Sequence, residues 1–330
     1  GSPNYHFTDR FILKEGWNQI TTMFNERGFN LLQIVLRGSG KVYIKNIKGE
    51  TIRYPWKRRG TFTCSDPLLN RIQEVSVNTL EACSSDVFMD CPWRERAFWV
   101  NDLLVLNHSS LAAFGARKLH KRAFKLLFSH KDSQGLLPAV CPRTDGDGNA
   151  FSATNLFLML ILKEYLYASA DMETVRCYMH DMEKVFEVLS ASRDENGLLI
   201  APPGYWHFYD WSFQHNGYTF TQLPESMLNS LYIRALKTFI ELEEIVKSGS
   251  TKCQEYKQEI LRSKEFLLKE FVTDGRLYDN CLKIAENKPT KISSQLSHAL
   301  ALLSGETPAE LQESFIAALN DMDILLPDLY

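Results

Sequence analysis

The stretch Ser65-Asp-Pro-Leu-Leu-Asn-Arg-Ile-Gln-Glu-Val-Ser-Val-Asn-Thr-Leu80 marks where the chain changes its pattern. Ser65 and Asp66 are suited to cap a helix, and Pro67 is suited to its first turn. Apolar residues then recur at helical spacing as far as Leu80. The stretch therefore predicts the first helix of a helical region.

The same pattern continues downstream of this helix. Loops rich in Gly, Pro and Asp separate the helical stretches, and no strong strand alternates with them, which disfavours a (β/α)8 barrel. The fold class predicted is mainly α, built of stacked helical hairpins. The helices expected after the first lie near residues 93–113, 116–130, 152–169, 172–192, 223–247, 251–272, 291–304 and 307–320.

Upstream of residue 61 the sequence favours strands instead. Phe29-Asn-Leu-Leu-Gln-Ile-Val-Leu36 is rich in β-forming residues, Lys41-Val-Tyr-Ile-Lys-Asn46 alternates apolar and polar residues, and Gly38-Ser-Gly40 between them indicates a turn. Two or three strands cannot bury a core by themselves. We therefore expect two parts: residues 1–60 as the edge or remnant of a β-sandwich, and residues 61–330 as a helical domain.

Composition excludes several classes of protein. Of the 330 residues 45% are hydrophobic and 23% charged, and the net charge of −3 gives no basic surface for nucleic acid or anionic lipid. No apolar run reaches the roughly 18 residues of a membrane span. The seven cysteines show no zinc-binding spacing. Gly1-Ser2 is typical of a cloning remnant, so the compartment stays open between periplasmic, secreted and cytoplasmic.

One segment carries a pattern that a solvated helix does not explain: Asp90-Cys-Pro-Trp-Arg-Glu-Arg-Ala-Phe-Trp-Val-Asn-Asp102. If Pro92 begins a helix, Glu95, Trp99 and Asp102 share one face. Two carboxylates around a tryptophan provide what a sugar pocket needs, namely an acid, a partner for hydroxyl groups and an apolar platform. The alternative is a helix start with acidic residues near the positive end of its dipole.

This segment resembles the signature of the α-L-rhamnosidases of glycoside hydrolase family 78. Gly60-Thr-Phe-Thr-Cys-Ser-Asp-Pro-Leu-Leu-Asn70 is similar to the entry to that family's catalytic domain. The resemblance covers residues 25–330 and is strongest between 60 and 105. It implies an (α/α)6 barrel, or six-hairpin toroid, preceded by β-sandwich domains, and hydrolysis with inversion at the anomeric carbon.

The resemblance also implies roles for single residues. Glu95 corresponds to the general acid, Asp90 and Asp102 to carboxylates that hold rhamnose hydroxyls, Arg94 to a sugar-binding residue and Trp99 to an aromatic wall. Trp93 and Ala97-Phe98 depart from the family pattern, which affects the pocket rim and leaves the carboxylates in place. Arg94 and a helix start favour ionised Glu95, whereas burial against Trp99 favours the protonated acid, and the sequence leaves this balance open.

A second candidate region is the aromatic segment Pro202-Pro-Gly-Tyr-Trp-His-Phe-Tyr-Asp-Trp-Ser212. Pro and Gly mark it as a loop, and a loop has little reason to hold so many aromatic rings unless they stack on sugars or seal helix ends. Trp206, Asp210 and Trp211 are the further substrate-binding candidates, and Asp210-Trp211 resembles the family's pocket wall. We expect Trp206 or Trp211 to share one concavity with Glu95. Glu225 is interpreted as the start of a helix.

The second catalytic carboxylate is missing from the pattern. An inverting glycosidase needs a general base about 6.5–9.5 Å from its acid. Nothing after Asp274 resembles the family segment that holds this base, and the sequence predicts about nine helices, fewer than a closed barrel of six hairpins requires. We therefore expect a barrel that is incomplete at its C-terminal side, and a chain that is inactive alone.

The prediction is a glycosidase that cleaves terminal α-L-rhamnose from glycans or glycosides, without a cofactor or metal. Its partner is a carbohydrate substrate, with no nucleic acid and no membrane span, and its oligomeric state is open. The alternatives are a non-catalytic sugar-binding relative and another six-hairpin glycosidase with a different sugar specificity. A lyase is disfavoured, because Asp90 and Asp102 supply no Tyr or His base.

Overall fold

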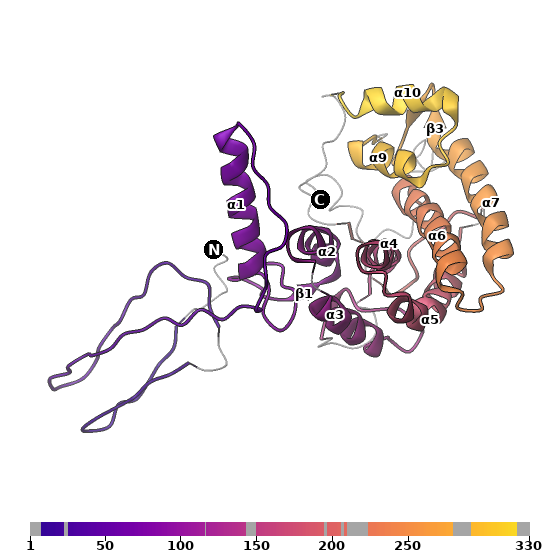
Figure 1. The fold of residues 1–330 in the computed structure, drawn as a ribbon. Coiled ribbons are helices and arrows are strands. Elements are labelled where there is room, and N and C mark those ends of the chain that lie inside the picture. Colours follow the sequence, from indigo (N-terminus) through magenta and orange to yellow (C-terminus); the bar gives the residue numbers. More distant parts are fainter. Residues whose placement is uncertain are drawn as a thin grey trace.

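The computed structural model describes residues 8–22, 26–115, 117–142, 150–194, 197–205, 208–209, 224–279 and 292–321. Helices dominate this part of the chain, and each helix expected from the sequence is found (Figure 1). The helices are α1 Pro67–Ala82, α2 Val100–Phe114, α3 Lys118–Ser129, α4 Ser152–Ser169, α5 Met172–Ser190, α6 Ser226–Val246, α7 Cys253–Phe271, α9 Gln295–Ser304 and α10 Ala309–Ala318. Their ends agree with the prediction within a few residues, except for the start of α2.

The helices form successive hairpins with an inner and an outer member. The inner helices α2, α4, α6 and α9 pack side by side in that order, and the outer helices α3, α5, α7 and α10 follow them along the chain. α1 packs against α2 at one end of the row (Figure 1). The inner helix α4 is buried on nearly all sides, and its run Leu156–Leu162 is almost wholly buried. Among the described residues, no helix has the length and hydropathy to cross a bilayer.

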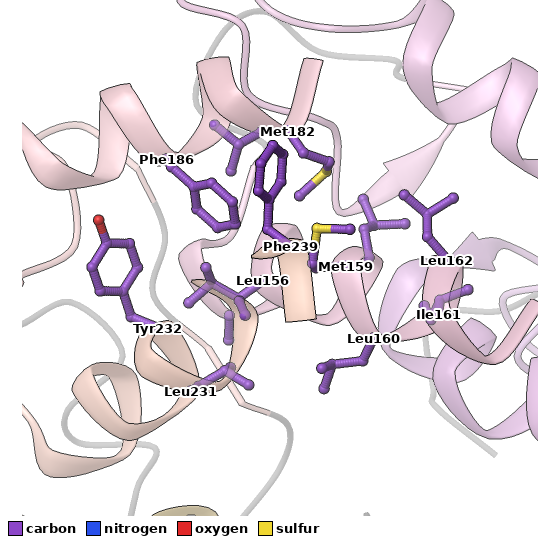
Figure 2. Close-up of a cluster of buried hydrophobic side chains, with 14 of the residues drawn as sticks. Leu156, Met159, Leu160, Ile161, Leu162, Met182, Phe186, Leu231, Tyr232 and Phe239 are labelled. Atoms are coloured by element: carbon purple, nitrogen blue, oxygen red, sulfur yellow. The ribbon is translucent and has the colours of Figure 1, made fainter. Parts of the chain in front are cut away.

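The core lies between the inner helices and the outer layer. Leu156 and Met159 of α4 meet Met182 and Phe186 of α5 and Phe239 of α6 (Figure 2). Phe186 and Phe239 contact edge to face, with ring centroids 5.8 Å apart. Burial of one such side chain contributes about 1.5–3 kcal/mol. This packing holds the inner helices in register, and thereby fixes where their first residues lie.

A side-chain clamp recurs at the start of three inner helices. The residue four positions after the N-cap accepts a hydrogen bond from the amide of a leucine in the preceding connection, and it donates one to the N-cap carbonyl. The clamps are Asn155 with Leu137 (2.9 Å) and Phe151 (3.0 Å), Asn229 with Leu199 (2.9 Å) and Glu225 (2.8 Å), and His298 with Leu277 (3.2 Å) and Ser294 (2.8 Å). The Ser294 carbonyl only accepts, so Nδ1 of His298 carries a proton. The Leu277 amide only donates, so Nε2 carries none and the ring is neutral. The structure thus has a repeat that the sequence did not reveal.

The strands are short and lie within the helical part. β1 (Phe98–Trp99) pairs antiparallel with β2 (Val140–Cys141), so that Phe98 faces Cys141 and Trp99 faces Val140. β3 (Val272–Thr273) and β4 (Arg276–Leu277) form a second antiparallel pair after α7. The first pair fixes the chain directly before α2 to the connection that leads into α4.

Residues before α1 differ from the expected small sheet. Residues 8–22 and 26–66 contain no strand, and their backbone runs out from the helices as extended loops (Figure 1). The β-forming side chains of residues 29–36 are exposed, so the described part of the chain gives these strands no face to cover. The segment does dock at its end, where Trp56 stacks on Phe114 with ring centroids 4.5 Å apart.

Candidate active site

The segment that holds Glu95 is a closed loop, and the prediction of a helix from residue 93 is wrong. Asp90 and Ala97 pair across the loop: the Asp90 amide donates to the Ala97 carbonyl (3.0 Å), and the Ala97 amide donates to the Asp90 carboxylate (2.8 Å). Arg96 adopts a left-handed conformation with φ of 52°, which a continuing helix does not allow. Helix α2 therefore begins only at Val100, after β1.

Glu95 lies between two donors. Its Oε1 accepts from Arg94 Nη2 (2.5 Å), and its Oε2 accepts from the indole Nε1 of Trp99 (2.8 Å). The Glu95 side chain is 29% exposed, so solvent and a ligand can reach the carboxyl group. Glu95 and Trp99 are thus neighbours, as the sequence predicted, but a loop brings them together instead of a shared helix face.

Asp90 and Asp102 stand on either side of this loop. Asp90 is half-buried, and Asp102 lies in the first turn of α2. The Cys83 thiol lies close to Asp90, with its Sγ 3.9 Å from the Asp90 carbonyl oxygen. Burial and the neighbouring Cys91, Asp90 and Asp102 raise the pKa of Cys83 to about 11. The two aspartates therefore lie within electrostatic reach of one thiol.

An aromatic wall adjoins Glu95. Trp99 stacks on Phe151 with ring centroids 6.4 Å apart, and Phe208 contacts Phe151 edge to face with ring centroids 5.8 Å apart. Ala139 completes this small buried cluster. Sequence reasoning missed Phe151, because this residue is the N-cap of α4 and nothing in its local sequence distinguishes it from a core residue.

The aromatic segment reaches this wall through Phe208. The three substrate-binding candidates of that segment, Trp206, Asp210 and Trp211, lie outside the described residues. The expected place of Trp206 or Trp211 in one concavity with Glu95 therefore stays a prediction.

Residues before α1 also hold the Glu95 loop. The Arg96 guanidinium contacts both the backbone carbonyl and the carboxylate of Glu26. Gly28 lies so close to this loop that a Cβ there would stand 2.8 Å from the carbonyl oxygen of Pro92. The N-terminal segment thus supports the site, a role that its β-rich sequence did not indicate.

Glu225 begins a helix, as interpreted from the sequence, but this does not account for its side chain. It is the N-cap residue of α6, yet its carboxylate makes no capping hydrogen bond and the residue is only 2% exposed. Burial and the adjacent Glu225 carboxylate raise the pKa of the Tyr209 hydroxyl. The Glu225 side chain therefore faces the aromatic segment.

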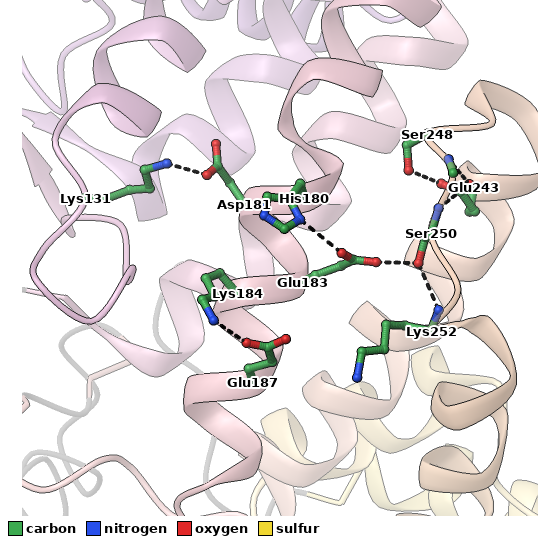
Figure 3. Close-up of polar contacts among 11 residues, drawn as sticks. Lys131, His180, Asp181, Glu183, Lys184, Glu187, Glu243, Ser248, Ser250 and Lys252 are labelled. Carbon is green, nitrogen blue, oxygen red and sulfur yellow. Dashed lines mark hydrogen bonds and ion pairs between the residues drawn. The ribbon is translucent and has the colours of Figure 1, made fainter.

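A cavity of about 280 Å³ lies away from Glu95, where α5 and α7 cover α6. Charged side chains around it are already paired: Arg193 and Arg262 contact Glu259, and Lys252 contacts Glu255. Figure 3 shows the adjoining contacts, in which Lys184 pairs with Glu187 and Ser250 joins the connection after α6 to α5. This arrangement stabilises the outer layer and accounts for the charges without a ligand.

Comparison with known proteins places the chain in a family. The profile described as the bacterial alpha-L-rhamnosidase 6 hairpin glycosidase domain matches residues 57–322. A curated α-L-rhamnosidase of Formosa agariphila is 23% identical over 333 residues, which cover 96% of this chain and 33% of that protein. The chain thus spans about a third of this curated relative.

Solved structures share the fold. A rhamnosidase from Klebsiella oxytoca with rhamnose bound superposes with a TM-score of 0.68 at 22% identity, covering 80% of this chain and 49% of that one. A family 78 rhamnosidase of Bacillus sp. GL1 superposes with a TM-score of 0.73 at 20% identity, covering 83% and 28%. The predicted six-hairpin class of α/α fold is confirmed. The chain belongs to the family of bacterial α-L-rhamnosidase six-hairpin glycosidase domains.

Proposed function

We propose that this chain carries the proton-donor side of an α-L-rhamnosidase active site, with Glu95 as the general acid. The observation that carries the proposal is the accessible Glu95 carboxyl group, held between Arg94 and Trp99. Family membership and a relative with rhamnose bound support the sugar.

The proposed reaction needs no cofactor. The Glu95 proton passes to the glycosidic oxygen as the bond between that oxygen and the anomeric carbon breaks, and the aglycone leaves as an alcohol. Water attacks the anomeric carbon from the opposite face and gives its proton to a carboxylate. We place this general base in a part of the protein beyond the present chain. Asp90, Arg94, Trp99 and Asp102 are proposed to bind the sugar, together with Trp206, Asp210 and Trp211, which lie outside the described residues.

Activity of the full-length protein tests the proposal. The purified protein is assayed against a panel of 4-nitrophenyl glycosides, and proton NMR identifies the anomer released first. We expect hydrolysis of the α-L-rhamnoside with β-L-rhamnose as the first product. Binding of rhamnose without turnover would support a non-catalytic relative, and preference for another glycoside would support a different specificity.

Asp102→Asn separates binding from proton transfer. Because hydroxyl contacts do not depend on the leaving group, we expect this variant to lower kcat/KM for 4-nitrophenyl and natural α-L-rhamnosides by the same factor, about tenfold or more. The measurement is kcat/KM for both substrates in the full-length protein. A loss confined to the natural linkage would instead give Asp102 a role in proton transfer.

We also propose that residues 61–330 form only part of a closed barrel, and that residues 1–60 belong to a β domain. α1 supports the first statement, because an apolar stripe of Leu68, Ile72 and Val75 is 64%, 51% and 45% exposed. Such a stripe normally packs on another helix. The proposal that residues 1–60 belong to a β domain is supported by residues 29–36, because these β-forming side chains are exposed and would normally be covered by other strands.

Ile72→Lys tests the incomplete barrel. In the 330-residue chain the substitution is expected to change the melting temperature little and to reduce aggregation, because Ile72 is exposed. In the full-length protein the same lysine is expected to be buried by added helices, which costs about 2–5 kcal/mol. The measurement is the change in melting temperature that Ile72→Lys causes in the 330-residue chain and in the full-length protein. Equal melting-temperature changes in the two would remove the proposal, and Glu74→Lys on the same helix serves as the surface control.

A further inference from the structure

The described residues of the aromatic segment are anchored at its beginning. Tyr205 is buried, and its hydroxyl donates to Asp132 Oδ2 over 2.6 Å. The other oxygen of Asp132 accepts from the backbone amides of Gln134, Gly135 and Leu136, at 2.8–2.9 Å. A carboxylate with this many donors is a rigid acceptor. The connection between α3 and β2 therefore fixes Tyr205.

A second contact holds the same segment at Tyr209. The Tyr209 hydroxyl is enclosed, and the buried Glu225 carboxylate lies beside it. Glu225 is the N-cap of α6, and the clamp at Asn229 holds its backbone carbonyl. The described residues of the segment are thus attached to the connection between α3 and β2 and to the start of α6.

Phe208 lies between these two attachments. It packs on Phe151, and Phe151 stacks on Trp99, whose indole nitrogen donates to Glu95. The β1–β2 pair is a second link between Trp99 and this cluster. Val140 pairs with Trp99, and it directly follows Ala139, which packs with Phe151 and Phe208. A displacement of the segment would therefore be passed to the Trp99 ring through direct packing.

We propose that Asp132 and Tyr205 are positioning residues, which hold the aromatic wall of Phe208, Phe151 and Trp99 at the sugar-facing side of Glu95. The inference rests on the proposed function, since it assigns the wall to the rhamnose-binding site. A purely structural contact that seals helix ends would stabilise the protein without changing the Trp99 environment, and this difference can be measured.

Tyr205→Phe in the full-length protein removes one hydroxyl group and keeps the ring. The matched control is Tyr167→Phe, because the Tyr167 hydroxyl also donates to a carboxylate, Glu241 (2.5 Å), but near the C-terminal end of α4. All tryptophans are labelled with 5-fluorotryptophan, and Trp99→Phe identifies the Trp99 signal in the fluorine NMR spectrum. Melting temperatures and kinetics on 4-nitrophenyl α-L-rhamnoside are measured in parallel.

For Tyr205→Phe we expect a shifted or broadened Trp99 signal and a KM raised by about three- to tenfold, with kcat changed by less than about twofold. Phe208→Ala should produce the same changes in the Trp99 signal and in KM. Phe208→Leu should produce smaller changes than Phe208→Ala. Tyr167→Phe should change neither the Trp99 signal nor KM.

Three results would overturn the proposal: an unchanged Trp99 signal in Tyr205→Phe, equal signal changes in Tyr205→Phe and Tyr167→Phe, or a loss of kcat at constant KM. If wild type lacks rhamnosidase activity but the Trp99 signal responds to Tyr205→Phe alone, the positioning contact stands and the proposed function fails.

Discussion

Glu95→Gln in the full-length protein is expected to keep rhamnose binding and to lose about 10²–10⁴-fold in kcat on natural rhamnosides. Glutamine keeps the shape of the side chain and can still contact Arg94 or Trp99, but it cannot deliver a proton. The loss should be much smaller for 4-nitrophenyl α-L-rhamnoside, because nitrophenolate leaves with little protonation. Steady-state kinetics on both substrates, with rhamnose affinity from calorimetry, measures the effect.

The comparison between substrates makes this prediction specific. Equal losses of kcat on both would remove Glu95 as proton donor and leave it as one more binding carboxylate. Glu164→Gln on α4 is a suitable control, because Glu164 contacts Asn107 away from the site and its substitution should leave both rates unchanged.

Asp279→Asn is expected to raise stability increasingly as the pH rises from 5 to 7. Asp279 is 1% exposed and joins two inner helices, since its carbonyl accepts from Ser226 (3.0 Å) and its carboxyl Oδ1 accepts from the amide and hydroxyl of Ser294. Burial raises the pKa of Asp279 to about 7, while hydrogen bonds from Ser297 and Ser294 oppose the shift and the nearby Glu225 adds to it.

The sign follows from proton binding. A carboxyl group with a raised pKa in the folded state contributes stability that is complete below its unfolded pKa, and this stability is lost as the pH rises through the folded value. The loss amounts to about 1.4 kcal/mol for each pH unit between the two values, or about 3 kcal/mol from pH 5 to 7. Asparagine resembles the protonated acid and avoids this loss.

Urea unfolding of wild type and Asp279→Asn at pH 5, 6, 7 and 8 tests the prediction. Burial lowers the pKa of neighbouring His298, so wild type also loses stability as the pH falls below about 6.5. Because both proteins contain His298, its contribution cancels in the difference between them. A difference in unfolding free energy that stays constant from pH 5 to 8 would contradict the prediction.

The sequence determined the helical hairpins, because the signals that define them are local. A proline at the first position, a capping aspartate and apolar periodicity gave α1, and the apolar run of α4 gave its bounds. The motif from Asp90 to Asp102 likewise identified the candidate acid and its tryptophan neighbour. Residues close in sequence can meet in few ways, so a local pattern was sufficient.

The tertiary structure alone decided how the site is assembled. The pairing of Asp90 with Ala97 and the left-handed Arg96 delay α2 to Val100, although the residues favoured a helix. Tertiary contacts had to override local preference there. Residues 29–36 favour a strand but form none, because a strand needs a partner that local sequence cannot supply.

The support of Glu95 also depends on residues far apart in the chain. Tyr205 meets Asp132 across 73 positions, and Arg96 meets Glu26 across 70. No periodicity encodes such pairs, because long stretches of chain separate the partners and only tertiary contacts bring them together. The sequence thus identified the candidate residues for the chemistry, and the tertiary structure decided which residues hold these candidates in place.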